Sequence, residues 1–269
     1  MIGASLGTIA TALIISLVIV AQRRKDFRHG FEIALSYAIY SALLVVIVFI
    51  LEYFFKLFSK VSFFLATAIG PKLSLLKLPN FVELLTSPVL NFLFKYNNKF
   101  ILLILGFSIL IFTLKYIGKS MINVLGGEDK SRIFINKHFD SKFKVYFLGV
   151  FLTAIVFSSS VTIGLLIPLA VTGVISLRKA IPFILGADLG TFTDVFLASV
   201  IIDQPLALAT AFAYMLFGII GALIFLPNTE FLYKITKFTS KRLIKISRNK
   251  AFYILIAFIL VPLLVILIF

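Results

Sequence analysis

Long apolar runs constrain the fold of this chain more than any other feature of its sequence. Most reach the roughly 20 residues that a helix needs to cross the hydrocarbon core, whereas strands of a membrane barrel would alternate over about 10 residues. Hydrophobic residues make up 61% of the chain and charged residues 14%, unlike an ordinary soluble domain. The runs lie near 2–21, 31–55, 99–118, 145–177, 180–202, 205–226 and 251–269. We therefore predict an all-α polytopic membrane protein, multi-pass in the cytoplasmic (plasma) membrane.

The distribution of charge predicts the topology. The net charge is +15, and cytoplasmic loops of membrane proteins collect Lys and Arg, so we interpret this charge as a topology signal and predict no nucleic-acid partner. The basic segments 22–30, 119–144 and 228–250 are predicted to lie inside, and the acidic 203–205 outside. Basic residues between Lys234 and Lys250 follow roughly one helical face, which predicts an interfacial helix on anionic lipid.

Several kinds of chemistry are disfavoured by composition. The chain has no cysteine, which excludes disulfides, thiolate metal sites and cysteine nucleophiles. No spacing resembles a nucleophile with its base or a metal cluster, so we predict neither an enzyme nor a cofactor.

Glu32 and Glu52 lie near the ends of an apolar run and are predicted to reach the interface, and Asp203 is predicted to be a solvated helix end.

A short repeat links the start of the chain to its second half. The stretch "IGASLGTIAT" returns 183 residues later as "LGADLGTFTD", so that Gly3 and Gly7 correspond to Gly186 and Gly190. Each copy precedes another long apolar run, 31–55 or 205–226. The loops after the two copies differ in charge and are predicted to lie on opposite faces, which indicates an inverted repeat. The alternative is a chance likeness between two glycine-rich helices.

The two apolar blocks between the inner Lys144 and the outer Asp203 must make an odd number of crossings. We therefore predict that 145–177 is a re-entrant hairpin and that 180–202 is a single span, broken near Gly186 to Thr191. Irregular backbone at membrane depth is tolerated only where protein covers it or where it lines a cavity. Both interruptions are thus predicted to face one site.

The hairpin carries hydroxyl groups suited to an anion. A half-helix that starts inside the membrane offers free N–H groups and the positive end of its dipole, and serines there can cap the helix and donate to an oxyanion. The predicted substrate-binding residues are Ser158, Ser159, Ser160 and Thr162. The alternative, equally supported by composition, is that small residues serve close helix packing.

Two acids in the neighbouring span indicate a cation site. Asp188, Thr191 and Asp194 are three residues apart and could share a ridge, and their oxygens suit a hard cation such as sodium. Ser5 and Thr8, in the first copy of the repeat, are included in the predicted cation-binding set. The alternative is that either acid pairs with Arg178 or Lys179, or that Asp194 faces water.

The stretch "FSSSVTIGLLIPLAVTGVISLRKAIPFILGADLGTFTD" resembles the second repeat of the sodium–phosphate cotransporters, type II and their bacterial relatives. Their signature is Gln-Ser-Ser-Ser followed by Gly-Ser/Ala-Asn-Ile-Gly-Thr-Thr. The resemblance implies that the three serines contact phosphate or sodium and that Thr191 and Thr193 lie near the cations. Phe157 replaces the glutamine, Asp188 replaces the asparagine, and Asp194 stands where the family has a threonine. The added negative charge requires a cation or a proton to neutralise it.

The implied function is sodium-coupled symport of inorganic phosphate, with no metal beyond transported sodium. The alternatives are a truncated or non-transporting subunit, or transport of another anion coupled to protons. Residues 1–58 resemble the end of the first repeat without its Ser-rich hairpin. The alternatives for this difference are a misassigned start, a truncated gene, or a homodimer or second subunit that supplies the missing part. Expected partners are therefore phosphate, sodium, membrane lipids and, in the last of these alternatives, the additional subunit. The predicted organisation is 1–58, a partial first repeat; 59–144, a connecting region with a helix at about 99–118; 145–227, the second repeat; and 228–269, a basic segment with a C-terminal span.

Overall fold

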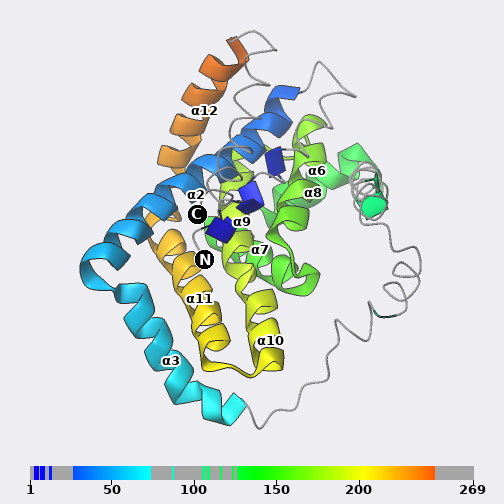
Figure 1. Ribbon diagram of the computed structural model, residues 1–269. Coiled ribbons are helices and arrows are strands. Elements are labelled where there is room, and N and C mark those ends of the chain that lie inside the picture. Colours follow the sequence, from blue (N-terminus) through cyan, green and yellow to red (C-terminus); the bar gives the residue numbers. More distant parts are fainter. Residues whose placement is uncertain are drawn as a thin grey trace.

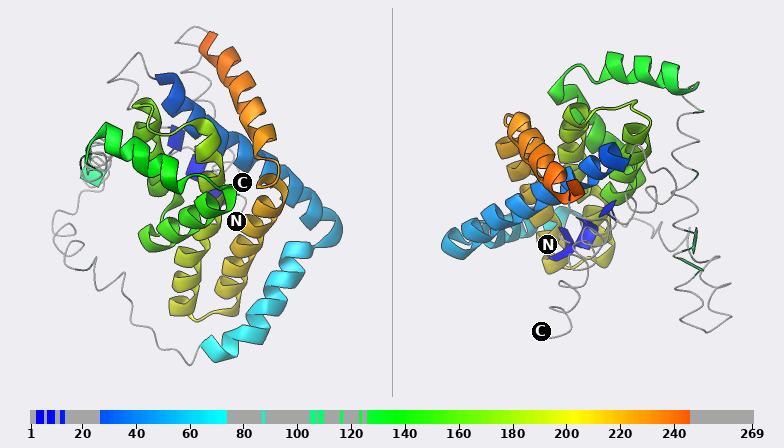
Figure 2. Two further views of the ribbon diagram at one scale, coloured as in Figure 1. Left: turned by 180° about the vertical axis from the view of Figure 1, so that it is seen from behind. Right: turned by 90° about the horizontal axis from the view of Figure 1, so that it is seen from above.

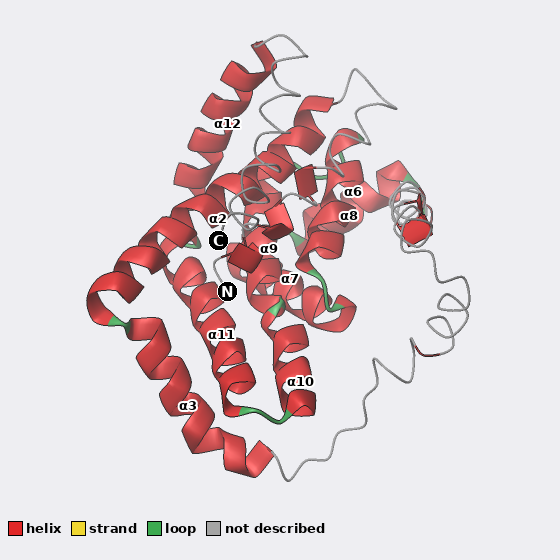
Figure 3. Ribbon diagram, viewed as in Figure 1, coloured by secondary structure: helices red, strands yellow, loops and turns green. Residues whose placement is uncertain are grey.

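The computed structural model describes residues 3–5, 7–9, 12–13, 27–73, 87, 105–106, 108–109, 116, 123 and 126–245. Every regular element within these ranges is a helix (Figure 3). Three are long and apolar enough to cross a membrane, namely Arg28–Phe55, Leu177–Ile202 and Pro205–Phe225. The prediction of an all-α membrane protein is confirmed, and these helices match three predicted runs. The runs at 2–21, 99–118 and 251–269 lie wholly or mostly outside the described residues.

In chain order the helices are α2 (Phe27–Phe55), α3 (Leu57–Leu73), α6 (Glu128–His138), α7 (Lys142–Val156), α8 (Ser159–Val171), α9 (Leu177–Gly190), α10 (Phe192–Ile202), α11 (Pro205–Phe225) and α12 (Thr229–Lys245). Short connections join α2 to α3 and each helix from α6 onward to the next (Figure 1). Helix α3 packs against α11, and α12 packs against α2. The helix that follows α2 thus packs against α11, and the helix that follows α11 packs against α2. These two contacts lie at opposite ends of the molecule (Figures 1 and 2). The predicted division into 1–58, 59–144, 145–227 and 228–269 stays a prediction.

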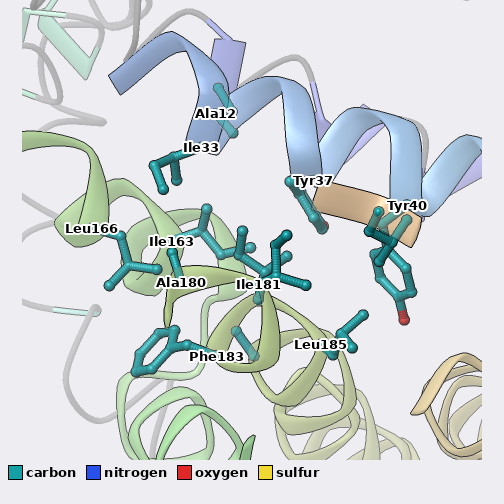
Figure 4. Packing of buried hydrophobic residues seen from close by; sticks show 14 of the residues in the cluster. Ala12, Ile33, Tyr37, Tyr40, Ile163, Leu166, Ala180, Ile181, Phe183 and Leu185 are labelled. Atoms are coloured by element: carbon teal, nitrogen blue, oxygen red, sulfur yellow. The ribbon is translucent and has the colours of Figure 1, made fainter. Parts of the chain in front are cut away.

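The main core lies between α2, α8 and α9 (Figure 4). Ile33, Ile163, Ile181 and Leu185 from these helices are at most 1% exposed. In a bilayer the lipid tails are as apolar as these side chains, so the driving force for this contact is close packing rather than exclusion of water. The shape of the helix surfaces therefore decides how the site-bearing helices are held.

The predicted hairpin at 145–177 has the form of a helix, a tight turn and a second helix. Helix α7 has 15 residues and α8 has 13, and each is shorter than the roughly 20 that a span requires. Phe157 closes α7 in a left-handed conformation with φ of 56°, and its N–H donates to the Thr153 carbonyl. The chain reverses there, so the serines stand at the tip of the hairpin as predicted.

The predicted break in the following span is smaller than expected. Only Thr191 separates α9 from α10, and its dihedral angles of −60° and −23° remain helical. Gly186 and Gly190 lie within α9 and serve close packing instead. A Cβ at Gly186 would lie 1.9 Å from the Tyr146 carbonyl oxygen of α7, so the glycine lets two backbones touch.

Of the two acids of α2, Glu32 does not reach solvent, whereas Glu52 is half-buried near the end of the helix and its place at the interface stays a prediction. Glu32 is fully buried, and its carboxylate pairs with Arg28 at 3.0 Å and with Lys237 of α12 at 2.5 Å. Glu52 accepts hydrogen bonds from the N–H groups of Phe58 and Ser59, at 2.9 and 3.2 Å, and so caps the start of α3. Both carboxylates therefore join helices. Asp203 is exposed at the end of α10, as predicted.

Candidate functional site

Helix α8 begins inside the hairpin with a serine cap. The Ser158 Oγ accepts the N–H of Val161 at 3.3 Å. The Ser158 carbonyl accepts the Thr162 hydroxyl at 2.7 Å, so two of the four predicted anion ligands are used within the first turn. Ser159 is buried and Ser160 is half-buried. Among the predicted ligands, Ser159 and Ser160 are therefore the ones whose hydroxyls the cap does not use.

Asp188 is a buried carboxylate in the middle of the Leu177–Ile202 span. The Tyr40 hydroxyl of α2 donates a hydrogen bond to its Oδ2 at 2.8 Å. No ion pair to Asp188 occurs within the described ranges, and Arg178, a possible partner by sequence, instead pairs with Glu230 at 2.8 Å. The alternative that Arg178 neutralises Asp188 is thus wrong. A buried charge with a single neutral donor is costly unless a cation or proton joins it.

The other predicted cation ligands of this span lie one or two turns further on. Thr191, Thr193 and Asp194 are all half-buried. The Thr191 hydroxyl donates to the Ala187 carbonyl at 3.2 Å, and Asp194 accepts the N–H of Val195 at 2.7 Å. Tyr214 of α11 lies within electrostatic range of both Asp188 and Asp194. The two carboxylates therefore share a neighbour, although no hydrogen bond joins them directly.

The first copy of the repeat contributes less to this arrangement. Ser5 is buried, and the Thr8 hydroxyl donates to the Ala4 carbonyl of its own helical stretch at 2.9 Å. Neither side chain hydrogen-bonds to α8 or α9 in the part of the chain that the structure describes. Their predicted role in cation binding stays a prediction.

Two tyrosines of α2 that sequence reasoning did not select join both halves of the candidate site. Tyr40 binds Asp188, and Tyr37, one turn earlier, lies beside the side chains of Ser159 and Ser41. Tyr37 and Tyr40 are 1% and 0% exposed. Figure 4 shows Tyr40 extending from α2 with its hydroxyl at the far end, toward α9 and α11. Two phenols three residues apart in an apolar run were the available signal, because a buried tyrosine hydroxyl requires a partner.

The site is thus assembled from three helices and combines two chemistries. Helix α8 presents its N-terminal turn and serine hydroxyls, α9 presents a buried carboxylate, and α2 supplies the phenols that contact both. N–H and hydroxyl donors suit an anion, whereas carboxylate and hydroxyl oxygens suit a hard cation. The arrangement can therefore hold an anion and a cation close to each other.

Comparison with known proteins relates this arrangement to a family. A profile of the family described as "Na+/Pi-cotransporter" matches residues 109–241. The uncharacterized protein YqeW of Bacillus subtilis is 36% identical over 88 residues, which are 33% of this chain and 28% of that protein. No solved structure matches.

Two mammalian relatives carry functional names. Sodium-dependent phosphate transport protein 2A of Oryctolagus cuniculus is 34% identical over 123 residues, covering 44% of this chain and 19% of that protein. Sodium-dependent phosphate transport protein 2B of Homo sapiens is 33% identical over 176 residues, covering 61% of this chain and 26% of that protein. The chain thus spans between 19% and 28% of the length of these three relatives. The match includes the serine hairpin, the Asp188 span and α11, and it places residues 109–241 in the Na+/Pi-cotransporter family.

Proposed function

We propose that this chain takes part in sodium-coupled transport of inorganic phosphate across the plasma membrane. The observation that supports this most is the meeting of the α8 serine turn and the buried Asp188 carboxylate on the two tyrosines of α2. In this proposal phosphate binds at the turn, with Ser159 and Ser160 as donors, and sodium binds at Asp188 and neighbouring oxygens. Each ion lowers the cost of burying the other, which couples their transport.

The residues of the two predicted sites have distinct roles in this proposal. Ser158 and Thr162 hold the shape of the α8 turn, because the Ser158 Oγ accepts the Val161 N–H and the Thr162 hydroxyl donates to the Ser158 carbonyl. Thr191, Thr193 and Asp194 line the cation side, and Tyr214 lies within electrostatic range of both acids. A homodimer or a second subunit that contributes further site residues remains part of the proposal.

Phosphate uptake into proteoliposomes tests the proposal. Purified full-length chain should take up radiolabelled phosphate when an inward sodium gradient is applied, and little when choline replaces sodium. Ser159→Ala should raise the phosphate concentration for half-maximal uptake by about tenfold or more, because a hydrogen bond to a charged group is worth about 1.5–3 kcal/mol. Ser176→Ala is the matched control, since Ser176 is exposed and its side chain makes no cap hydrogen bond.

The same assay distinguishes the other functions. Phosphate uptake driven by a proton gradient in sodium-free medium would favour coupling to protons, for which the second acid, Asp194, is the supporting observation, and proton-driven uptake of a different labelled anion but not of phosphate would favour another substrate. Absence of uptake under every gradient, with the protein folded, would favour a non-transporting subunit. Uptake that responds equally to Ser159→Ala and to Ser176→Ala would contradict the assignment of the serine turn.

A further inference from the structure

Three helices meet at the hydroxyl of Tyr40. The phenol starts on α2 and donates to Asp188 Oδ2 on α9 at 2.8 Å. On its other side lies Gly221 of α11, where an added Cβ would be 2.2 Å from the Tyr40 hydroxyl. The ring itself packs edge-on against Phe225 of α11, with centroids 5.5 Å apart and planes at 87°. The phenol is therefore confined to one position by its neighbours.

This confinement also fixes the Asp188 carboxylate. Oδ2 is held by Tyr40, while Oδ1 accepts no hydrogen bond from the residues that the structure describes. Beside the same face of α2 lies Ser41, whose buried hydroxyl also lacks a hydrogen-bond partner within the described ranges. Unsatisfied buried oxygen atoms are costly and are commonly explained by a bound ion or water. Asp188 Oδ1 is therefore available as a cation ligand.

We propose that Tyr40 is the positioning residue of the coupling-cation site, holding Asp188 by one oxygen so that the other can bind the ion. This inference rests on the proposed function, from which it takes sodium as the ion. Tyr40 does not contact the ion in this scheme and acts through Asp188. Partners that orient a metal-binding carboxylate or imidazole typically change metal affinity by about 10–100-fold when they are removed.

The proposal extends the site to α11. The missing side chain of Gly221 provides the space for the Tyr40 hydroxyl, and the atoms nearest to an added Cβ belong to Tyr40 and Leu44. A methyl group at this position would displace the hydroxyl and with it the hydrogen bond to Asp188. Gly221→Ala is therefore expected to weaken cation binding in the same way as Tyr40→Phe, without altering any ion-contacting group.

Sodium-dependent thermal stabilisation of the purified full-length chain tests this inference without requiring transport. The apparent unfolding temperature is measured against NaCl concentration, with choline chloride keeping the ionic strength constant. The wild type should be stabilised by sodium in a saturable way. Tyr40→Phe should raise the half-saturating sodium concentration by about tenfold or more. Tyr146→Phe is the matched control, because Tyr146 is also buried and in electrostatic range of Asp188 but donates no hydrogen bond to it.

The possible outcomes separate a positioning role from a merely structural one. A Tyr40→Phe protein that unfolds at a lower temperature but keeps the wild-type sodium titration would overturn the proposal, and so would a wild type without sodium-specific stabilisation. If Gly221→Ala does not fold, Tyr40→Phe alone decides. Sodium stabilisation that persists without any phosphate uptake would count against the proposed function only. In the uptake assay, Tyr40→Phe should raise the sodium concentration for half-maximal rate while the maximal rate is largely kept.

Discussion

Replacing Gly186 with alanine should separate α7 from α9. A Cβ at this position would lie 1.9 Å from the Tyr146 carbonyl oxygen and 3.0 Å from the Val150 nitrogen, whereas ordinary contacts begin at 3.4 Å. Both atoms belong to the backbone of α7, so no side-chain rotation relieves the clash. On the facing side, a Cβ at Gly149 would meet the Phe183 carbonyl oxygen at 2.3 Å, which shows that the two backbones already touch.

The expected destabilisation is large for one methyl group. Overpacking costs typically 1–3 kcal/mol, and contact with rigid backbone places Gly186→Ala at the upper end, about 3 kcal/mol. At about 2–4 °C per kcal/mol for a chain of this size, the apparent unfolding temperature should fall by about 6–12 °C. The measurement is thermal unfolding of the detergent-purified protein, followed by fluorescence-detected size exclusion.

Gly3→Ala is the matched control for this prediction. Gly3 corresponds to Gly186 in the repeat, but a Cβ there would meet nothing within 4 Å. Alanine is the better helix former at an exposed position, so this variant should be as stable as the wild type or slightly more stable. Equal unfolding temperatures for the wild type and Gly186→Ala would refute the close approach of α7 and α9.

Three further predictions concern two ion pairs and one helix cap. Lys237→Met should weaken the docking of α12 by about 1.5–3 kcal/mol, because it removes a cation from the buried Glu32. Limited proteolysis should then cleave α12 faster in this variant than in the exposed control Lys241→Met. Glu52→Ala should cost about 0.5–2 kcal/mol by uncapping α3, seen as faster amide exchange in its first turn; unchanged exchange there would contradict the cap. The pair of Arg178 and Glu230 is roughly half exposed, so a double-mutant cycle should give a coupling below about 1 kcal/mol, and a larger value would show that it is shielded from water.

Features that depend on neighbouring residues could be predicted from the sequence. The length of each apolar run gave the three described spans, and the turn at Phe157 with its following serines gave the hairpin and the capped start of α8. The glycine pair of α9 predicts a break when only local sequence is considered, because glycine weakens isolated helices. In the folded chain the same residues are helical, since the contact with α7 compensates for their low propensity.

Contacts between distant residues could not be predicted in this way. The sequence by itself determined that the chain spans a membrane and that polar groups interrupt its apolar runs, because hydropathy and local hydrogen bonding act over a few residues. Only the tertiary structure decided their partners: Tyr40 meets Asp188 across 148 positions, and Lys237 meets Glu32 across 205. Such partners are chosen by how helix surfaces fit together, and that fit depends on all of the packed side chains at once.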